Sequence, residues 1–332
     1  MDEIGTNKII NPAPSQFPFQ DKALQVSAEC VKAVVYENLG KSDFTDQLLT
    51  GYQKMVNKKS VVDLLPLVLY LTHATDMMPG VPLMSAWQLM RLAAKSFDDA
   101  EDESVQVPQL INSGTAFLFL SEMILGKIKE HIKDYARISK IIRQYNHACL
   151  CACGGQFLDL QGQSTLINVD PDTWSKIAMN KSGDLFAWAA WSGVYLAGVE
   201  ESSLESYFNF GRYLGALVQV NDDFDGVWGV NGSGDLENFR VSLPYVYAFH
   251  VAPLNERESL LTLIEKAGQN EDLKKEIKEI LINLGAQKFL LAVMIDLRKK
   301  ALDALDSSGH NTANRLDLAV ELLNKVCPPL VR

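Results

Sequence analysis

Apolar residues recur every three to four positions through most of this chain of 332 residues, and that spacing is typical of helices packed along one face. Clear examples lie at 64–71, 117–128 and 286–297. The alternating pattern of strands is scarce, and no linker rich in proline, glycine or serine divides the chain. The pattern therefore predicts one all-α domain over residues 21–332. The segment 1–20 contains three prolines and is expected to form an extended arm.

An acidic cluster ends one of these helical patterns, where the sequence reads DDAED at 98–102. One face of the preceding helix carries residues spaced by four, three, four and four positions: Trp87, Arg91, Ala94, Asp98 and Asp102. Pro82 marks the expected start of this helix, and Pro108 lies beyond its expected end. Asp98 and Asp102 are therefore expected to project side by side, one turn apart.

A second acidic cluster, Asp222-Asp223-Phe224-Asp225, repeats this arrangement. It continues a stripe that consists of Leu204, Phe208, Gly211, Gly215 and Val218. The two glycines are expected to leave room beside the helix. Carboxylates on an apolar stripe are costly unless positive charge meets them. Two such clusters on facing helices could hold several divalent cations, which could in turn hold an oxygen-rich ligand such as a diphosphate.

Polar residues elsewhere in the chain fit a ligand of this kind. Lys181-Ser182-Gly183 precedes a helix that carries Trp188 on the face of the lysine. Gln219 lies one turn before the second acidic cluster, and Arg240 follows that cluster at a distance of less than twenty residues.

The order of these motifs resembles that of the trans-isoprenyl diphosphate synthase family, which is also called the polyprenyl synthetase family. The matching segments are DDAED at 98–102, GGQFLDL at 154–160, NKSGDLF at 180–186, FGRYLGALVQVNDDFDG at 210–226 and DLENFRVSLP at 235–244. The resemblance extends from about residue 50 to the C-terminus. It implies an isoprenoid synthase helical bundle around a central cavity, with the two aspartate clusters facing each other across its mouth.

In this family, Mg²⁺ ions bound by the aspartates hold the diphosphate of an allylic prenyl diphosphate while its C–O bond breaks. The resemblance implies three such ions, which Mn²⁺ could replace, on Asp98, Asp102 and Asp222. It assigns supporting roles to Asp99, Asp223, Asp225, Gln156, Asp159 and Ser182. The diphosphate-binding residues that it implies are Lys181, Arg240, Arg91 and Gln219. The catalytic set that it implies comprises Asp98, Asp99, Asp102, Asp222 and Lys181.

The length of the prenyl tail is expected to depend on the helix before the first cluster. In the family, bulky aromatic residues four and five positions before that cluster close the tail pocket, and small residues open it. This chain has Ala94 and Ala93 there, and Ala94 lies on the stripe of Asp98. Further expected lining residues are Trp87, Met90 and Trp188. The resemblance therefore implies a C15 or C20 substrate, farnesyl or geranylgeranyl diphosphate, rather than dimethylallyl diphosphate.

Two segments that hold a second diphosphate in chain-elongating members are altered here. Their GGKRxRP segment is replaced by SVVDLLP at 60–66, with Asp63 at the position of one cation. Their paired arginines after the first cluster are replaced by Val107-Pro108. Losing three charge-assisted hydrogen bonds would weaken binding of the acceptor, isopentenyl diphosphate, by about 5–9 kcal/mol. In addition, Gly226 stands where the family has the last aspartate of the second motif.

These departures leave three interpretations open. The first, which we favour from the sequence, is an enzyme that ionises an allylic diphosphate and then cyclises the cation or transfers it to a non-standard acceptor. Such an enzyme would be terpene synthase-like or an atypical prenyltransferase. The second is a chain-elongating polyprenyl diphosphate synthase of the farnesyl or geranylgeranyl type, with an acceptor site rebuilt around residues such as Arg91 and Lys95. The third is a non-catalytic prenyl-diphosphate-binding subunit of a heteromeric synthase, although the intact first cluster argues against it.

Charge and hydropathy exclude other classes of protein. The net charge of −10 and the absence of basic runs argue against a nucleic-acid partner. No run of about 18 apolar residues occurs, so we expect no transmembrane segment. The N-terminal residues lack a basic segment followed by an apolar one, which favours a cytoplasmic location. The resemblance implies a homodimer, with a heteromer containing an active homologue as the alternative.

Overall fold

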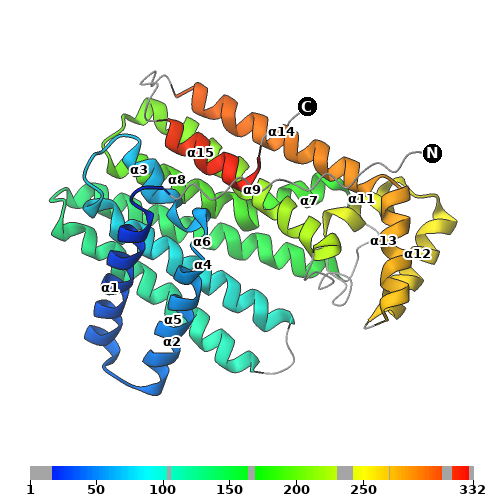
Figure 1. Cartoon of the computed structure of the whole chain (residues 1–332), viewed down its shortest axis with the longest axis horizontal. Helices are drawn as coiled ribbons and strands as arrows, with labels where there is room; N and C mark the ends of the chain where they lie inside the picture. Colours follow the sequence, from blue (N-terminus) through cyan, green and yellow to red (C-terminus); the bar gives the residue numbers. More distant parts are fainter. Residues whose placement is uncertain are drawn as a thin grey trace.

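All regular secondary structure in the described part of the chain is helical (Figure 1). The computed structural model describes residues 17–102, 106–163, 169–229, 242–268, 270–308 and 316–328, and only the backbone at 102, 162 and 163. Its α-helices are α1 (Gln20–Leu39), α2 (Asp43–Asn57), α3 (Leu65–Leu71), α4 (Val81–Asp102), α5 (Val107–Leu125), α6 (Tyr135–Gln163), α7 (Pro171–Ala178), α8 (Asp184–Leu196), α9 (Glu201–Trp228), α11 (Leu243–Val251), α12 (Leu254–Ala267), α13 (Glu271–Asn283), α14 (Ala286–Asp306) and α15 (Asp317–Val326). The short helical turns are η1 (Val61–Leu64), η2 (Met78–Gly80), η3 (Gly126–Glu130) and η5 (Met179–Gly183). The predicted all-α bundle is confirmed, whereas the arm predicted at 1–20 lies mostly outside the described residues and stays a prediction.

Helix α8 lies inside the bundle because its sequence is apolar on nearly every side. It contacts α3, α6 and α9, and α9 in turn contacts α14. The close approach of α3 requires the glycine at 193, since a Cβ atom there would lie 2.3 Å from the carbonyl oxygen of Pro66. The interior position of α8 places the turn before it, η5, among the helices that carry the acidic clusters.

The sequence suggested that Gly211 and Gly215 leave open space beside α9, but the structure shows that this space is filled. A Cβ atom at Gly211 would lie 2.4 Å from the carbonyl oxygen of Phe186, and one at Gly215 would lie 2.9 Å from that of Ser182. The backbone of α8 and η5 therefore fills the space beside both glycines. This packing holds η5 against the half of α9 that leads to the second acidic cluster.

A buried polar network joins the hairpin of α1 and α2 to α4. Ser27 Oγ lies 2.6 Å from both Tyr52 OH and Ser85 Oγ. It also donates to Gln88 Oε1 at 2.9 Å. Buried polar groups are costly unless they are paired, so this network fixes the hairpin, at one edge of the molecule in Figure 1, relative to α4.

Within the described ranges, no single helix combines the length and the apolar composition that crossing a membrane requires. Helices α13 and α14 satisfy these criteria only as a pair, and they meet at a bend of 60°.

Candidate active site

The two acidic clusters lie at the C-terminal ends of α4 and α9. The side chains of Asp98 and Asp99 are 37 % and 35 % exposed. Asp222 and Asp225 are exposed, whereas Asp223 is buried. Each helix therefore presents carboxylates to solvent near its end, and α9 also directs one carboxylate into the protein.

Lys181 of η5 connects the first cluster with α6. Its Nζ donates to Asp159 Oδ2 at 2.8 Å and lies 3.7 Å from Asp98 Oδ1. The lysine side chain is 22 % exposed, so water screens these pairs only in part. The η5 turn is π-helical, and such wide turns are frequent at functional sites. The structure thus brings together Asp98, Asp159 and Lys181, which the sequence analysis placed in one site.

Hydrogen bonds connect the same turn with the second cluster. Ser182 Oγ donates to Gln219 Oε1 at 2.9 Å, and Gln219 Nε2 donates to Asp223 Oδ1 at 2.9 Å. Asp223 Oδ2 accepts from the backbone N–H of Leu243 at 2.6 Å. Asp223 Oδ1 is thus bound within α9, to the same Gln219 that contacts η5, and Oδ2 links α9 to the start of α11. These contacts suit the supporting role predicted for this residue.

The first cluster also contacts α6 through Glu101, which the sequence analysis passed over. Gln156 Nε2 donates to Glu101 Oε2. Within α4 itself, Lys95 Nζ pairs with Asp99 Oδ1 at 2.8 Å. The place of Glu101 inside the DDAED segment was the signal that could have identified it.

Arg91, an expected diphosphate-binding residue, forms an ion pair with Asp63 of η1. Asp63 is 1 % exposed, and the side chain of Arg91 is 31 % exposed. Burial raises the pKa of Asp63, and the guanidinium of Arg91 opposes that rise. A phosphate that took Arg91 from this pair would leave Asp63 buried and unpaired, which is costly. Sequence reasoning treated Asp63 only as the residue that replaces a family cation, and it missed the ion pair with Arg91.

The residues expected to line a tail pocket have different environments. Trp87, Met90 and Ala93 are buried, whereas Ala94 is exposed. Trp188 is also buried, and its Nε1 donates to the carbonyl oxygen of Ile141 at 3.2 Å. Trp188 lines a cavity between α6, α8 and α9, and neither Ala93 nor Ala94 lines it. The tail pocket beside α4 therefore stays a prediction.

Two predicted site residues cannot be placed. Arg240 lies outside the described residues, and so does the side chain of Asp102. Their roles as a diphosphate cation and a metal ligand stay predictions.

The described carboxylates fit metal ions that share their coordination shell with a ligand. Carboxylate oxygens are the ligands that Mg²⁺ prefers, and Asp98 of α4 and Asp222 of α9 carry such oxygens. In the part of the chain that the structure describes, no three His, Cys, Asp or Glu side chains form a group that could hold a metal ion. Mg²⁺ commonly takes one or two protein carboxylates and completes its shell with waters and phosphate oxygens. This donor set therefore suits Mg²⁺ bound together with a diphosphate.

The contact between Gly155 and η5 predicts that Gly155→Ala is destabilising. A Cβ atom at Gly155 would lie 2.5 Å from the backbone nitrogen of Lys181, so the turn must shift. We expect a loss of about 1–3 kcal/mol in the free energy of unfolding, measured by urea denaturation. The matched control is Gly154→Ala, because a Cβ atom there meets no atom within 4 Å. That variant should be neutral or more stable by up to about 1 kcal/mol, and equal effects of the two would contradict the proposed contact.

Comparison with protein families and sequences identifies similar proteins that are named as synthases of prenyl diphosphates. The polyprenyl synthetase family model matches residues 99–281. The short chain isoprenyl diphosphate synthase of Methanothermobacter thermautotrophicus is 26 % identical over 175 residues, which cover 50 % of this chain and 53 % of that protein. The geranylgeranyl diphosphate synthase of Mycobacterium tuberculosis is 30 % identical over 144 residues, which cover 41 % of this chain and 39 % of that protein. The octaprenyl diphosphate synthase of Escherichia coli is 28 % identical over 240 residues, which cover 68 % and 72 %. The first two matches thus span about half or less of those relatives.

Solved structures share the fold over nearly the whole chain. A polyprenyl synthetase from Streptomyces coelicolor A3(2) superposes with a TM-score of 0.76 at 20 % identity, covering 93 % of this chain and 98 % of the other. A geranylgeranyl pyrophosphate synthetase from Pyrococcus horikoshii gives a TM-score of 0.76 at 18 % identity, with 92 % and 98 % covered. At these identities the likeness establishes a common helical fold.

Proposed function

Since the chain belongs to the polyprenyl synthetase family, we propose that it binds the diphosphate group of an allylic prenyl diphosphate and elongates its prenyl chain. The observation that carries this proposal is the position of Lys181, which is held beside Asp98 and linked through the next residue to the second acidic cluster. Such an arrangement gathers one cation and two sets of carboxylates around a single turn, as metal-assisted diphosphate binding requires.

Chain elongation is supported by the names of the relatives, which are synthases of prenyl diphosphates of several lengths. They favour elongation over the cyclising or atypical-acceptor interpretation that we favoured from the sequence. The proposed substrate is farnesyl or geranylgeranyl diphosphate, on the basis of the small residues before the first cluster.

The proposed roles follow from the contacts of each residue. Mg²⁺, held by Asp98, Asp102 and Asp222, would supply positive charge that stabilises the departing diphosphate. Lys181 donates hydrogen bonds to that diphosphate, and its pairing with Asp98 and Asp159 keeps the ammonium group in place before the ligand arrives. A donor that is positioned in advance stabilises developing charge with little reorganisation.

A second candidate function is cyclisation of the prenyl cation, or its transfer to an acceptor that carries no diphosphate. The ion pairs of Arg91 with Asp63 and of Lys95 with Asp99 favour it, because the two cations expected to rebuild the acceptor site are already engaged. The second of these pairs is exposed and weak, so the buried pair carries most of this argument.

Incubation with labelled geranylgeranyl or farnesyl diphosphate and Mg²⁺, with and without isopentenyl diphosphate, tests both candidates. Elongation predicts a product longer by one or more isoprene units, formed only when isopentenyl diphosphate is present. A cyclic product or a prenyl alcohol formed equally well without isopentenyl diphosphate would support the second candidate and contradict the first. Binding of the labelled substrate without turnover in either arm would instead indicate a non-catalytic subunit.

The homodimer implied by the family is part of the same proposal. Large apolar side chains are exposed on two neighbouring helices, with Phe119 of α5 at 67 %, Leu150 of α6 at 71 % and Phe157 of α6 at 61 %. Apolar side chains of this size, exposed on two helices that contact each other, would suit the contact of a homodimer.

A further inference from the structure

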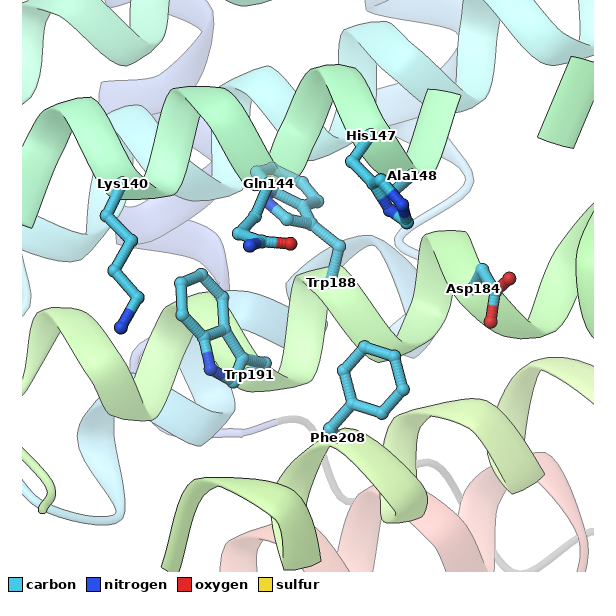
Figure 2. Close-up of a pocket in the computed structure, with 8 residues that line it drawn as sticks. All are labelled: Lys140, Gln144, His147, Ala148, Asp184, Trp188, Trp191 and Phe208. Carbon is cyan, nitrogen blue, oxygen red and sulfur yellow. The ribbon is translucent and has the colours of Figure 1, made fainter. Parts of the chain in front are cut away.

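A cavity of about 220 Å³ opens between α6, α8 and α9 (Figure 2). Lys181 is not among the residues that line it. Three aromatic side chains line it: Trp188 and Trp191 from α8, and Phe208 from α9. Asp184 lies at one end of the row of labelled side chains, and Lys140 lies at the other. A concave site with apolar walls and a few polar groups is the usual form of a small-molecule site.

The carboxylate of Asp184 is incompletely compensated by its neighbours. Its side chain is 16 % exposed, and Oδ1 lies 3.0 Å from Arg212 Nε. By strict geometry that nitrogen makes no aligned hydrogen bond among the described residues, so Arg212 offsets the charge of Asp184 mainly by electrostatic attraction. His147, which also lines the cavity, and Cys151 offset this charge to a smaller extent. Burial raises the pKa of Asp184 although Arg212, His147 and Cys151 together oppose the rise, which means that its negative charge is held at some cost.

The positive charge at the other end of the cavity is already neutralised. Lys140 Nζ pairs with Glu201, and it lies 5.0 Å from the centre of the Tyr195 ring. The lysine therefore neither requires an anionic ligand nor strongly repels a cation that binds at the Asp184 end.

We propose that this cavity binds a small organic cation, with an alkylated ammonium group placed between Trp188, Trp191 and Phe208 and directed toward Asp184. Aromatic faces attract cations, and an attraction of about 2 kcal/mol or more is reached when the cation is desolvated. An anion would meet the carboxylate of Asp184, and a neutral apolar ligand would bury that carboxylate further without compensating its charge.

Calorimetric titration with choline and with its neutral isostere 3,3-dimethylbutan-1-ol tests this proposal. Neither Mg²⁺ nor a diphosphate is added, so the outcome does not depend on the proposed catalytic function. The native chain should bind choline saturably, with a dissociation constant of about a millimolar or tighter, and the alcohol at least about tenfold more weakly. Equal binding of the two compounds, or no saturable binding of choline, would overturn the proposal.

Two variants assign the binding to this cavity. Asp184→Asn keeps the shape of the side chain and removes its charge, and it should weaken choline binding by about tenfold or more. Trp191→Leu should do the same by removing an aromatic face, and it tests the site independently if Asp184→Asn fails to fold. The matched control is Asp296→Asn, which removes an exposed carboxylate paired with Lys300 on α14. Unchanged choline binding in a folded Asp184→Asn or Trp191→Leu variant would refute the assignment.

Discussion

Replacing Asp98 with alanine should lower turnover of the allylic diphosphate by at least about a hundredfold, because the variant loses carboxylate oxygens proposed to bind metal. Asp98 lies at the end of α4 with 37 % of its side chain exposed, and Lys181 Nζ is 3.7 Å away. The substitution therefore removes both a proposed metal ligand and a carboxylate that helps to position the lysine. Asp159 of α6 also pairs with Lys181 and accepts its hydrogen bond at 2.8 Å.

The measurement is a single-turnover assay with labelled geranylgeranyl diphosphate at saturating Mg²⁺, supported by circular dichroism to confirm folding. Asp46→Ala is the control, since Asp46 is an exposed carboxylate on α2, at the hairpin edge of the molecule. It should retain the activity of the parent chain. An Asp98→Ala variant as active as the Asp46→Ala control, or a parent that is fully active in EDTA, would exclude the proposed role of the metal site.

The sequence predicted those parts of the fold and site that depend on periodicity and motif order. Helical spacing indicated the helices that became α4 and α9, because an apolar face recurs every three to four residues whatever it packs against. Motif order likewise grouped Asp98, Asp159 and Lys181, and the structure brings these three together. Their roles in binding metal and diphosphate stay predictions.

Features that depend on contacts between distant segments were not predictable in this way. The space beside Gly211 and Gly215 is taken by the backbone of another helix, which the periodicity of α9 alone cannot reveal. The pairing of Asp63 with Arg91 joins two segments whose separation in space is set by the whole bundle. Ala94 lies on the predicted stripe but is exposed, because the buried face of α4 is centred on residues such as Ala93 and Met90.

The same ion pair gives the second large prediction, which concerns stability. Arg91→Met should lower the free energy of unfolding at pH 7 by about 3 kcal/mol, because it leaves the carboxylate of Asp63 buried without a partner. We choose the low end of the range measured for broken buried pairs, since the side chain of Arg91 is 31 % exposed. The double variant Asp63→Leu/Arg91→Met replaces the pair with apolar side chains and should recover most of the loss.

The loss in free energy of unfolding caused by Arg91→Met should depend on pH, and the burial of Asp63 determines the direction of that dependence. The pKa of Asp63 is raised above its ordinary value of 3.8 in the folded chain, even with Arg91 present to oppose the rise. A carboxyl group that holds its proton more tightly when folded stabilises the protein at low pH, and this contribution is lost as the pH rises through the folded-state pKa. Removing Arg91 raises that pKa further. The difference in free energy of unfolding between Arg91→Met and the parent should therefore be small near about pH 4 and grow toward neutral pH. Urea denaturation of the parent, the single variant and the double variant between about pH 4 and 8 measures this trend. A deficit in the single variant that is constant with pH, or a double variant no more stable than the single one, would show that Asp63 is not a buried carboxylate that depends on Arg91.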